Sequence, residues 1–220
     1  MTAAAALAAM IVPQVGAQTR RHHENSVTRQ LHLTRAIEET YTHRWEIGGG
    51  GGFLRFEPGP LLRRDNQIDW AMSGAYYLTP AYGIVAEVSG HDGDVKLNNA
   101  LPGGPNIGSV HPLVTEYTFM AGPQWRFYRS EKYAISGHVM GGYAMGNFDG
   151  GSKGIAAPLL GMWPTGNAFA ASAGVDLDYN FYPNLALRVE PLYLYTHFGS
   201  ANQNNKGLNL ELVYRFGRIK

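Results

Sequence analysis

Apolar and polar residues alternate with a period of two along most of this chain. In residues 207–216, GLNLELVYRF, every second position is apolar: Leu208, Leu210, Leu212, Tyr214 and Phe216. Asn209, Glu211 and Arg215 stand between them. Because successive side chains of a strand point to opposite faces, this pattern predicts a β-strand with one apolar face. The other face carries an amide and two opposite charges.

Seven earlier segments repeat the pattern, so the sequence predicts eight strands. Their ranges are 44–56, 68–78, 82–91, 114–128, 133–147, 167–181, 185–197 and 207–216. The connections at 79–81, 129–132 and 182–184 are tight turns, whereas 57–67, 92–113, 148–166 and 198–206 are long, polar and rich in Gly, Asn and Pro. Short turns at one end and long loops at the other are typical of membrane barrels. We therefore predict an all-β fold over residues 44–220: an eight-stranded antiparallel up-and-down transmembrane β-barrel with short periplasmic turns and long external loops.

The alternation alone fits two arrangements. In a soluble lipocalin-like carrier the apolar face points inward, whereas in a membrane barrel it meets lipid and the polar face fills the lumen. Aromatic residues near the strand ends favour the membrane arrangement, because aromatic girdles mark the two lipid–water boundaries. The predicted girdle comprises Trp45, Tyr82, Trp125, Phe127, Tyr133, Phe169, Tyr179, Phe181, Tyr193, Tyr195, Tyr214 and Phe216.

The polar face predicts an ionic and hydrogen-bonded network in the lumen. Eight strands leave an interior that side chains fill, and a buried charge costs several kcal/mol unless it is paired. We expect Arg126, Arg188 and Arg215 to be the cationic centres of this network. Its predicted members are Glu46, Asp69, Glu87, Glu116, Arg126, His138, Asp176, Asp178, Arg188, Glu190, Glu211 and Arg215.

Two features interrupt the strand pattern. The glycine run at 48–52 superficially resembles a phosphate-binding loop, but no Lys-Ser/Thr pair and no helical pattern follow it. Glycines in a strand instead let the backbone of a narrow barrel curve. Pro123 donates no ladder hydrogen bond, so we expect a bulge or kink there.

The region before the predicted barrel divides into two parts. Residues 1–17, MTAAAALAAMIVPQVGA, are small and apolar and end in a small-residue cleavage site. We predict a signal peptide cleaved after Ala17, and the alternative is an ordinary buried helix. Residues 18–43 are polar, and we expect a mostly disordered periplasmic segment, in which residues 31–37 can form a short amphipathic helix. No run reaches the roughly 18 apolar residues that a membrane helix needs.

Composition narrows the functional classes. The 220 residues include no cysteine, which excludes disulfides and thiolate metal sites. The formal net charge of +1 gives no support for nucleic-acid binding. Charged residues are scarce at 16%, while 28 glycines and 12% aromatics are typical of many short strands joined by tight turns.

Four segments carry a family resemblance. They are WEIGGGGGF at 45–53, MAGPQWRF at 120–127, SAGVDLD at 172–178 and LVYRF at 212–216. On these segments, residues 44–217 resemble the small eight-stranded bacterial outer-membrane barrels of the outer-membrane protein A and opacity-protein type. Asn209, Tyr214 and Phe216 match the assembly signal of such proteins, although Glu211 replaces its glycine. The resemblance implies insertion by the barrel-assembly machinery and no shared enzymatic activity.

Some small outer-membrane barrels modify lipid A, and the resemblance to the deacylase type requires a His-x-Ser pair on one strand face. No histidine here is followed by serine two residues later. Ser136 and His138 have the reverse order and face the predicted lumen, and His197 and Ser200 have no acid beside them. A metal site at His91, Asp92 and Asp94 is less favoured than a solvated loop turn.

These observations predict a non-enzymatic outer-membrane β-barrel with a structural or surface-interaction role, exported through a cleaved signal peptide. We expect no catalytic residues, metal or cofactor. The expected partners are outer-membrane lipid and lipopolysaccharide, the barrel-assembly machinery and an extracellular ligand on the long loops, with no nucleic acid and a monomeric state. The alternatives are a lipid A-modifying barrel enzyme (a deacylase or acyltransferase) and, third, a soluble lipocalin-like carrier.

Overall fold

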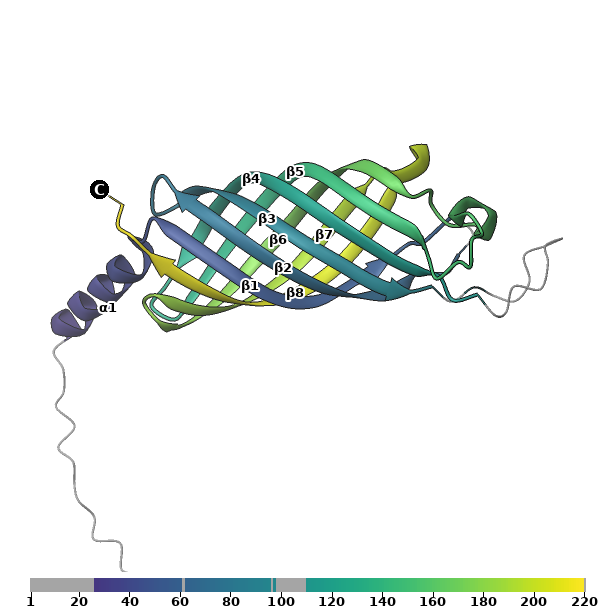
Figure 1. The fold of residues 1–220 in the computed structure, drawn as a ribbon. Coiled ribbons are helices and arrows are strands. Elements are labelled where there is room, and N and C mark those ends of the chain that lie inside the picture. The colour runs from purple at the N-terminus through teal and green to yellow at the C-terminus, as the bar shows by residue number, and fades with distance from the viewer. Residues whose placement is uncertain (1–25, 61, 96, 98–109, 220) are drawn as a thin grey trace, which may run out of the picture.

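The computed structural model describes residues 26–60, 62–95, 97 and 110–219. Eight strands form one closed antiparallel barrel in chain order, and the last strand pairs with the first (Figure 1). The strands are β1 (Trp45–Phe56), β2 (Asp65–Tyr77), β3 (Tyr82–Asp94), β4 (Leu113–Arg129), β5 (Tyr133–Gly150), β6 (Gly166–Tyr182), β7 (Leu185–Thr196) and β8 (Gln203–Phe216). The predicted fold class is confirmed.

Parts of the chain lie outside the described residues, namely the predicted signal peptide, residues 18–25 and residues 98–109 of the longest loop. Among the residues that are described, no helix is long and apolar enough to cross a membrane.

Several strands extend further into the long loops than predicted. β8 begins at Gln203 instead of residue 207, and β5 ends at Gly150 instead of residue 147. Gln203 and Asn205 are buried while Asn204 and Lys206 are exposed, so the period of two continues. The apolar pattern missed this extension because both faces are polar there.

The bulge expected at Pro123 is not observed. The β4–β5 register runs unchanged from Ala121 opposite Gly141 to Gln124 opposite His138, and its two irregularities lie between Leu113 and Thr115 and between Arg126 and Tyr128. The missing N–H of Pro123 removes a ladder hydrogen bond without shifting the strand.

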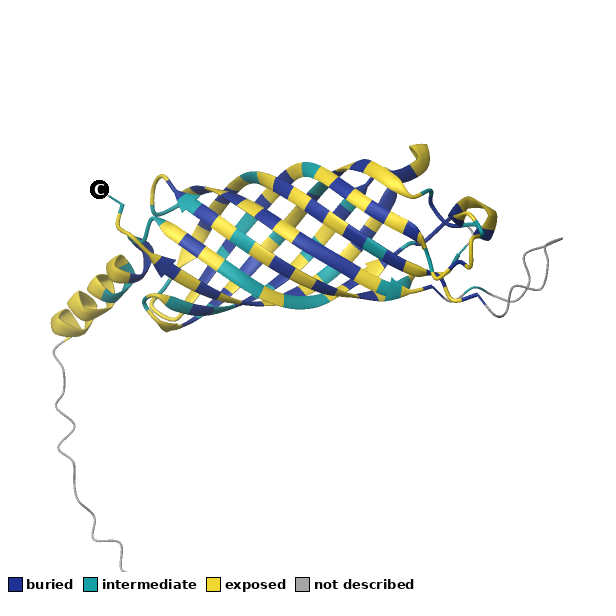
Figure 2. Cartoon of the chain, viewed as in Figure 1, coloured by how far each residue is buried: buried dark blue, intermediate teal, exposed yellow. Residues whose placement is uncertain are grey.

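The two faces of the barrel wall have opposite character, as the alternation of buried and exposed residues in Figure 2 shows. Trp70, Phe119 and Leu210 point outward and are 40%, 46% and 52% exposed. Asp176 and Arg188 point inward and are 1% and 4% exposed. Apolar side chains therefore cover the outside of the barrel, as the membrane arrangement predicts, and ionisable side chains occupy the inside.

A helix, α1 (Ser26–Tyr41), projects from the short-turn end of the barrel (Figure 1). Residues 26–41 are helical where a mostly disordered segment was expected, and the short helix considered around 31–37 lies within α1. Half of its residues are good helix formers such as Leu, Arg, Glu and Ala. Only the last turn packs on the barrel: Thr40 and Tyr41 are buried, whereas Val27 and Leu31 are exposed. The helix is therefore attached to the barrel by its last turn.

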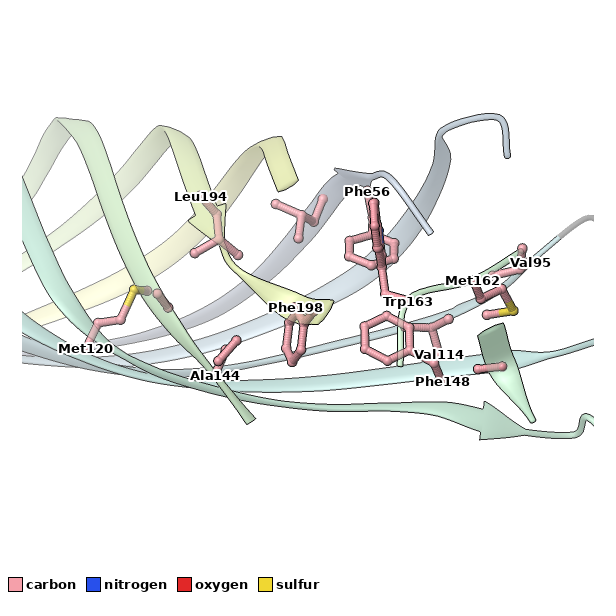
Figure 3. Close-up of a cluster of buried hydrophobic side chains, with 14 of the residues drawn as sticks. Phe56, Val95, Val114, Met120, Ala144, Phe148, Met162, Trp163, Leu194 and Phe198 are labelled. Atoms are coloured by element: carbon pink, nitrogen blue, oxygen red, sulfur yellow. The ribbon is translucent and has the colours of Figure 1, made fainter. Parts of the chain in front are cut away.

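Most of the buried apolar residues lie inside the barrel at its long-loop end (Figure 3). Phe148 stacks on Phe56 with ring centroids 6.0 Å apart and meets Phe198 edge-on at 5.1 Å. The loop after β5 folds over these rings: Trp163 donates from Nε1 to the carbonyl of Glu57 at 2.6 Å. We call the set Phe56, Val114, Phe148, Trp163 and Phe198 the loop-end cluster.

Candidate functional site in the barrel lumen

Three arginines and two carboxylates meet inside the short-turn end of the barrel. Arg215 donates from Nε to Glu46 Oε1 at 2.7 Å and from Nη2 to Asp178 Oδ2 at 2.7 Å. Arg188 donates from Nε to Asp178 Oδ1 at 2.7 Å and from Nη2 to Glu46 Oε2 at 3.2 Å. Arg126 also pairs with Glu46. We call these five residues the turn-end cluster.

The strand pattern explains this convergence. Glu46 lies directly opposite Arg215 in the β1–β8 register, and Asp178 lies opposite Arg188 in the β6–β7 register. Arg126 reaches Glu46 across the lumen, because β4 and β1 are not neighbours. All five side chains are buried, so each charge depends on its partners rather than on water.

Uncharged residues that the sequence reasoning missed complete this end of the lumen. Tyr41 of α1 donates from its hydroxyl to the carbonyl of Ser130 at 2.8 Å and accepts a 2.8 Å bond from Asn180 Nδ2. Burial raises the pKa of Tyr41 above its ordinary value of 10.0. The Arg126 guanidinium lies over the Tyr77 ring at 4.1 Å and over the Tyr41 ring at 5.0 Å. Tyr77 could have been placed in the lumen from the sequence, because it lies an even number of residues after Asp69 in the same strand and so shares its face.

A second group of acids lies deeper in the lumen. His138 Nδ1 is 3.3 Å from Asp176 Oδ1, and His138 Nε2 is 3.2 Å from Glu190 Oε1. Glu87, Glu190 and Glu211 each offer one oxygen, and these oxygens lie within 4.8 Å of one another. We call Glu87, Glu190 and Glu211 the glutamate group.

All twelve residues predicted for the lumen are buried on the inner face, but they do not form one continuous set of contacts. The turn-end cluster holds all three arginines. Asp69 contacts His91 instead, at 3.3 Å between Oδ1 and Nδ1. The carboxylate of Glu116 has no hydrogen-bond partner among the described residues.

The twelve residues predicted for the aromatic girdle lie on the outer face, and ten of them are exposed while Tyr179 and Tyr195 are half-buried. Tyr82 stacks on Trp125 across β3 and β4 with ring centroids 5.6 Å apart, and Tyr133 lies opposite Tyr179. These pairs and Trp45, opposite Phe216, ring the short-turn end. Phe169, Tyr193 and Tyr195 lie toward the long-loop end.

No family model matches the chain, and no curated protein matches it. Solved structures do. The attachment invasion locus protein Ail of Yersinia pestis is 14% identical, with 78% of this chain and 99% of Ail covered and a TM-score of 0.50. The outer membrane protein OprG of Pseudomonas aeruginosa is 11% identical, with 81% and 98% covered and a TM-score of 0.51. Neisserial surface protein A is 12% identical, with 78% and 97% covered and a TM-score of 0.50.

The chain has the fold of the small eight-stranded outer-membrane barrels. This agrees with the resemblance drawn from its sequence. At these identities the similarity concerns the fold alone. The function of this chain therefore has to be argued from its own residues.

One arrangement in the lumen has the order of a hydrolase triad. Ser89 Oγ is 3.3 Å from His91 Nε2, and His91 Nδ1 is 3.3 Å from Asp69 Oδ1. Sequence reasoning did not find it, because it considered the Ser-x-His order only at Ser136 and His138 and treated His91 only as a candidate metal ligand. Ser89 Oγ is also 2.5 Å from Thr118 Oγ1, and all four side chains are buried. The adjoining cavity measures about 10 Å³, room for about one water molecule, so an acyl chain does not fit beside Ser89.

Proposed function

We propose that this chain is a non-enzymatic outer-membrane barrel that presents its long loops outside the cell, with its short turns and α1 in the periplasm. The observation that carries the proposal is the chemistry of the outer wall. The outward positions carry no Asp, Glu, Lys or Arg along the spans 45–53, 68–76, 82–90, 117–127, 133–143, 169–181, 185–195 and 208–216. The exposed Asp92, opposite Ile68, lies beyond the β3 span at its long-loop end. A charge at the bilayer midplane costs about 2–4 kcal/mol for Arg or Lys, so this surface suits hydrocarbon.

The proposed lumen is closed to ions at both ends. The turn-end cluster and Tyr41 fill one end, and the loop-end cluster fills the other. The role of the barrel is therefore structural support and display of its loops to an extracellular ligand rather than transport. It acts as a monomer that the barrel-assembly machinery inserts.

Cell fractionation tests the proposed location. Expressed in a Gram-negative host, the protein should sediment with the outer membrane, remain in the pellet after salt washing, and migrate differently on gels before and after boiling. Recovery in the soluble periplasmic fraction would favour the carrier alternative instead.

The outer rim supports lipopolysaccharide as a partner. Arg55 and Lys206 lie directly opposite each other in the β1–β8 register and are both exposed. The next outward pair toward the short-turn end is Phe53 and Leu208, which are apolar and exposed. Like charges placed opposite each other destabilise a sheet, and an anionic phosphate between them offsets that repulsion. The lipid phosphate is thus bound where the apolar wall ends.

A stability measurement tests this contact. Lipopolysaccharide added to the barrel in detergent should raise the melting temperature of the wild type but not of R55A/K206A. The matched control is K132A, which removes an exposed lysine at the short-turn end and should behave as the wild type. An equal shift in R55A/K206A, or an equal shift on adding neutral phospholipid, contradicts the assignment.

The second candidate, a lipid A hydrolase, has one observation in its favour, the order of Asp69, His91 and Ser89. Their burial beside a cavity of about 10 Å³ counts against it. Mass spectrometry of lipid A from cells that express the wild type or S89A separates the two functions. Identical acyl-chain patterns support the non-enzymatic barrel, whereas an acyl change that disappears in S89A replaces it with the hydrolase.

A further inference from the structure

The glutamate group brings three carboxylates together without an arginine or lysine. Among the described residues no cationic side chain forms an ion pair with Glu87 or Glu211, and the only ion pair of Glu190 is with His138. Glu211 accepts one hydrogen bond, from Ser73 Oγ at 3.3 Å. The three side chains come from β3, β7 and β8 and are 6%, 3% and 1% exposed. Coulomb repulsion between buried carboxylates is severe, so something positive has to be shared among them.

The charge balance of the lumen leads to the same requirement. The described inner face buries eight carboxylates against three arginines and two histidines. All three arginines are engaged by Glu46, Asp176 and Asp178 near the short-turn end. Even with both histidines protonated, negative charge remains in excess in the middle of the barrel, where the glutamate group lies.

A separate observation points to a ligand at this place. Ser172 is 5% exposed and its Oγ has no hydrogen-bond partner among the described residues. Ser172 lines the same cavity of about 10 Å³ as Glu87 and Glu190. A buried hydroxyl without a partner is costly, and one that lines the same small cavity as two carboxylates can supply a neutral oxygen ligand.

Two glycines in the wall keep space free around the group. A Cβ at residue 48 would lie 2.5 Å from Ser73 Oγ and 2.9 Å from Glu211 Oε2, and a Cβ at residue 174 would lie 2.5 Å from the His138 ring and 3.2 Å from Glu190 Oε1. These two glycines are therefore required by the glutamate group together with the side chains that contact it, Ser73 and His138.

We propose that the glutamate group and Ser172 bind one hard divalent metal cation, such as calcium, inside the barrel. Calcium takes oxygen ligands at 2.3–2.6 Å, so two oxygens on opposite sides of one ion are about 4.8 Å apart. The three glutamate oxygens lie within 4.8 Å of one another, which a shared ion satisfies. A divalent charge also offsets most of the excess negative charge.

The neighbouring set of His138, Asp176 and Glu190 is less suited to a metal. Both imidazole nitrogens of His138 already face a carboxylate. Asp176 also accepts a 2.7 Å hydrogen bond from Gln124. The second oxygen of Glu190 remains available to the ion, because a carboxylate offers several acceptor sites.

Closure of both ends of the lumen sets the expected kinetics. An ion in the middle of the barrel is acquired as the barrel folds and is released slowly afterwards. The full chain is therefore refolded from urea into detergent micelles in chelator-treated buffer that contains calcium, magnesium or manganese singly. After gel filtration, elemental analysis of the folded barrel should give about one ion per chain with at least one of the three metals.

Variants locate the ion. E87Q/E211Q keeps the size of the side chains but removes two charges, and we expect it to lose the retained metal while it still folds. E116Q is the matched control, since Glu116 is equally buried but outside the glutamate group, and it should retain the metal. Should E87Q/E211Q fail to fold, the single variant E211Q takes its place in the comparison.

The melting temperature gives a second measure of metal binding beside the metal content. At an ion concentration about a hundredfold above Kd, binding should raise the melting temperature of the wild type and E116Q by about 5–10 °C, with no such shift in E87Q/E211Q. Folded wild type that holds no metal, or holds no more than E87Q/E211Q, overturns the proposal and means that the glutamates share protons instead. That result would leave the outer-membrane barrel itself intact.

Discussion

Arg215 on β8 donates a 2.7 Å hydrogen bond from Nη2 to Oδ2 of Asp178 on β6, although these two strands are not neighbours in the sheet. The bond therefore reaches past β7 through the lumen instead of following the wall. Because the same guanidinium also donates to Glu46 on β1, it joins both sides of the seam at which the barrel closes. The turn-end cluster therefore links strands from both ends of the chain through hydrogen-bonded ion pairs.

Removal of one arginine from this cluster should destabilise the barrel. Arg126→Ala leaves Glu46 with one fewer partner in a water-poor interior, and breaking a buried ion pair costs about 3–5 kcal/mol. We expect a lower midpoint in urea unfolding in detergent. Arg129→Ala, which removes an exposed arginine from the same strand, should leave the midpoint within error, and equal midpoints for the wild type and Arg126→Ala contradict the role of the cluster.

The hydroxyl of Tyr41 should tie α1 to the barrel in a pH-dependent way. Tyr41→Phe removes one donated and one accepted hydrogen bond, each worth about 1 kcal/mol. The raised pKa of Tyr41 means that the folded protein holds this proton above pH 10.0, where the unfolded chain has released it. The stability that the hydroxyl contributes is then present below pH 10.0 and is lost as the pH rises further.

The check for Tyr41 is a comparison of melting temperatures at two pH values. The wild type should melt above Tyr41→Phe at pH 8, and the difference should shrink at pH 11. A difference that stays constant between these pH values would mean that the hydroxyl does not titrate in the docked helix.

A closed lumen should conduct no measurable unitary current. In planar bilayers the wild type should show no discrete steps under conditions in which a wide porin does. Replacing Phe148 and Phe198 by alanine loosens only the loop-end cluster, so this variant should also remain silent because the turn-end cluster still blocks the other end. Reproducible steps from purified wild type would contradict closure of the lumen.

The strands were predictable because their signal is local. In β8, the alternation from Leu208 to Phe216 predicts both the strand and which of its residues share a face. The apolar face is then assigned to the outside because apolar side chains are stable against lipid. Ion pairs between neighbouring strands were nearly predictable too. Asp178 and Arg188 flank a tight turn and lie opposite each other.

Contacts across the lumen were not predictable in this way. The pairing of Arg126 with Glu46 depends on how far the strands are staggered around the closed barrel, and alternation along one strand contains no information on that stagger. The docking of Tyr41 was missed for another reason. Its contacts with Ser130 and Asn180 form only after the barrel mouth exists, so residues 26–41 look merely polar in the sequence.

The most direct test of the account is fluorescence quenching by brominated lipid. The chain has four tryptophans, and Trp70 is exposed on the outer wall whereas Trp163 is buried in the loop-end cluster. In barrels reconstituted into brominated bilayers, a variant that keeps only Trp70 should lose much of its emission, and one that keeps only Trp163 should not. Unquenched Trp70 beside strongly quenched Trp163 would contradict the claim that this wall faces hydrocarbon.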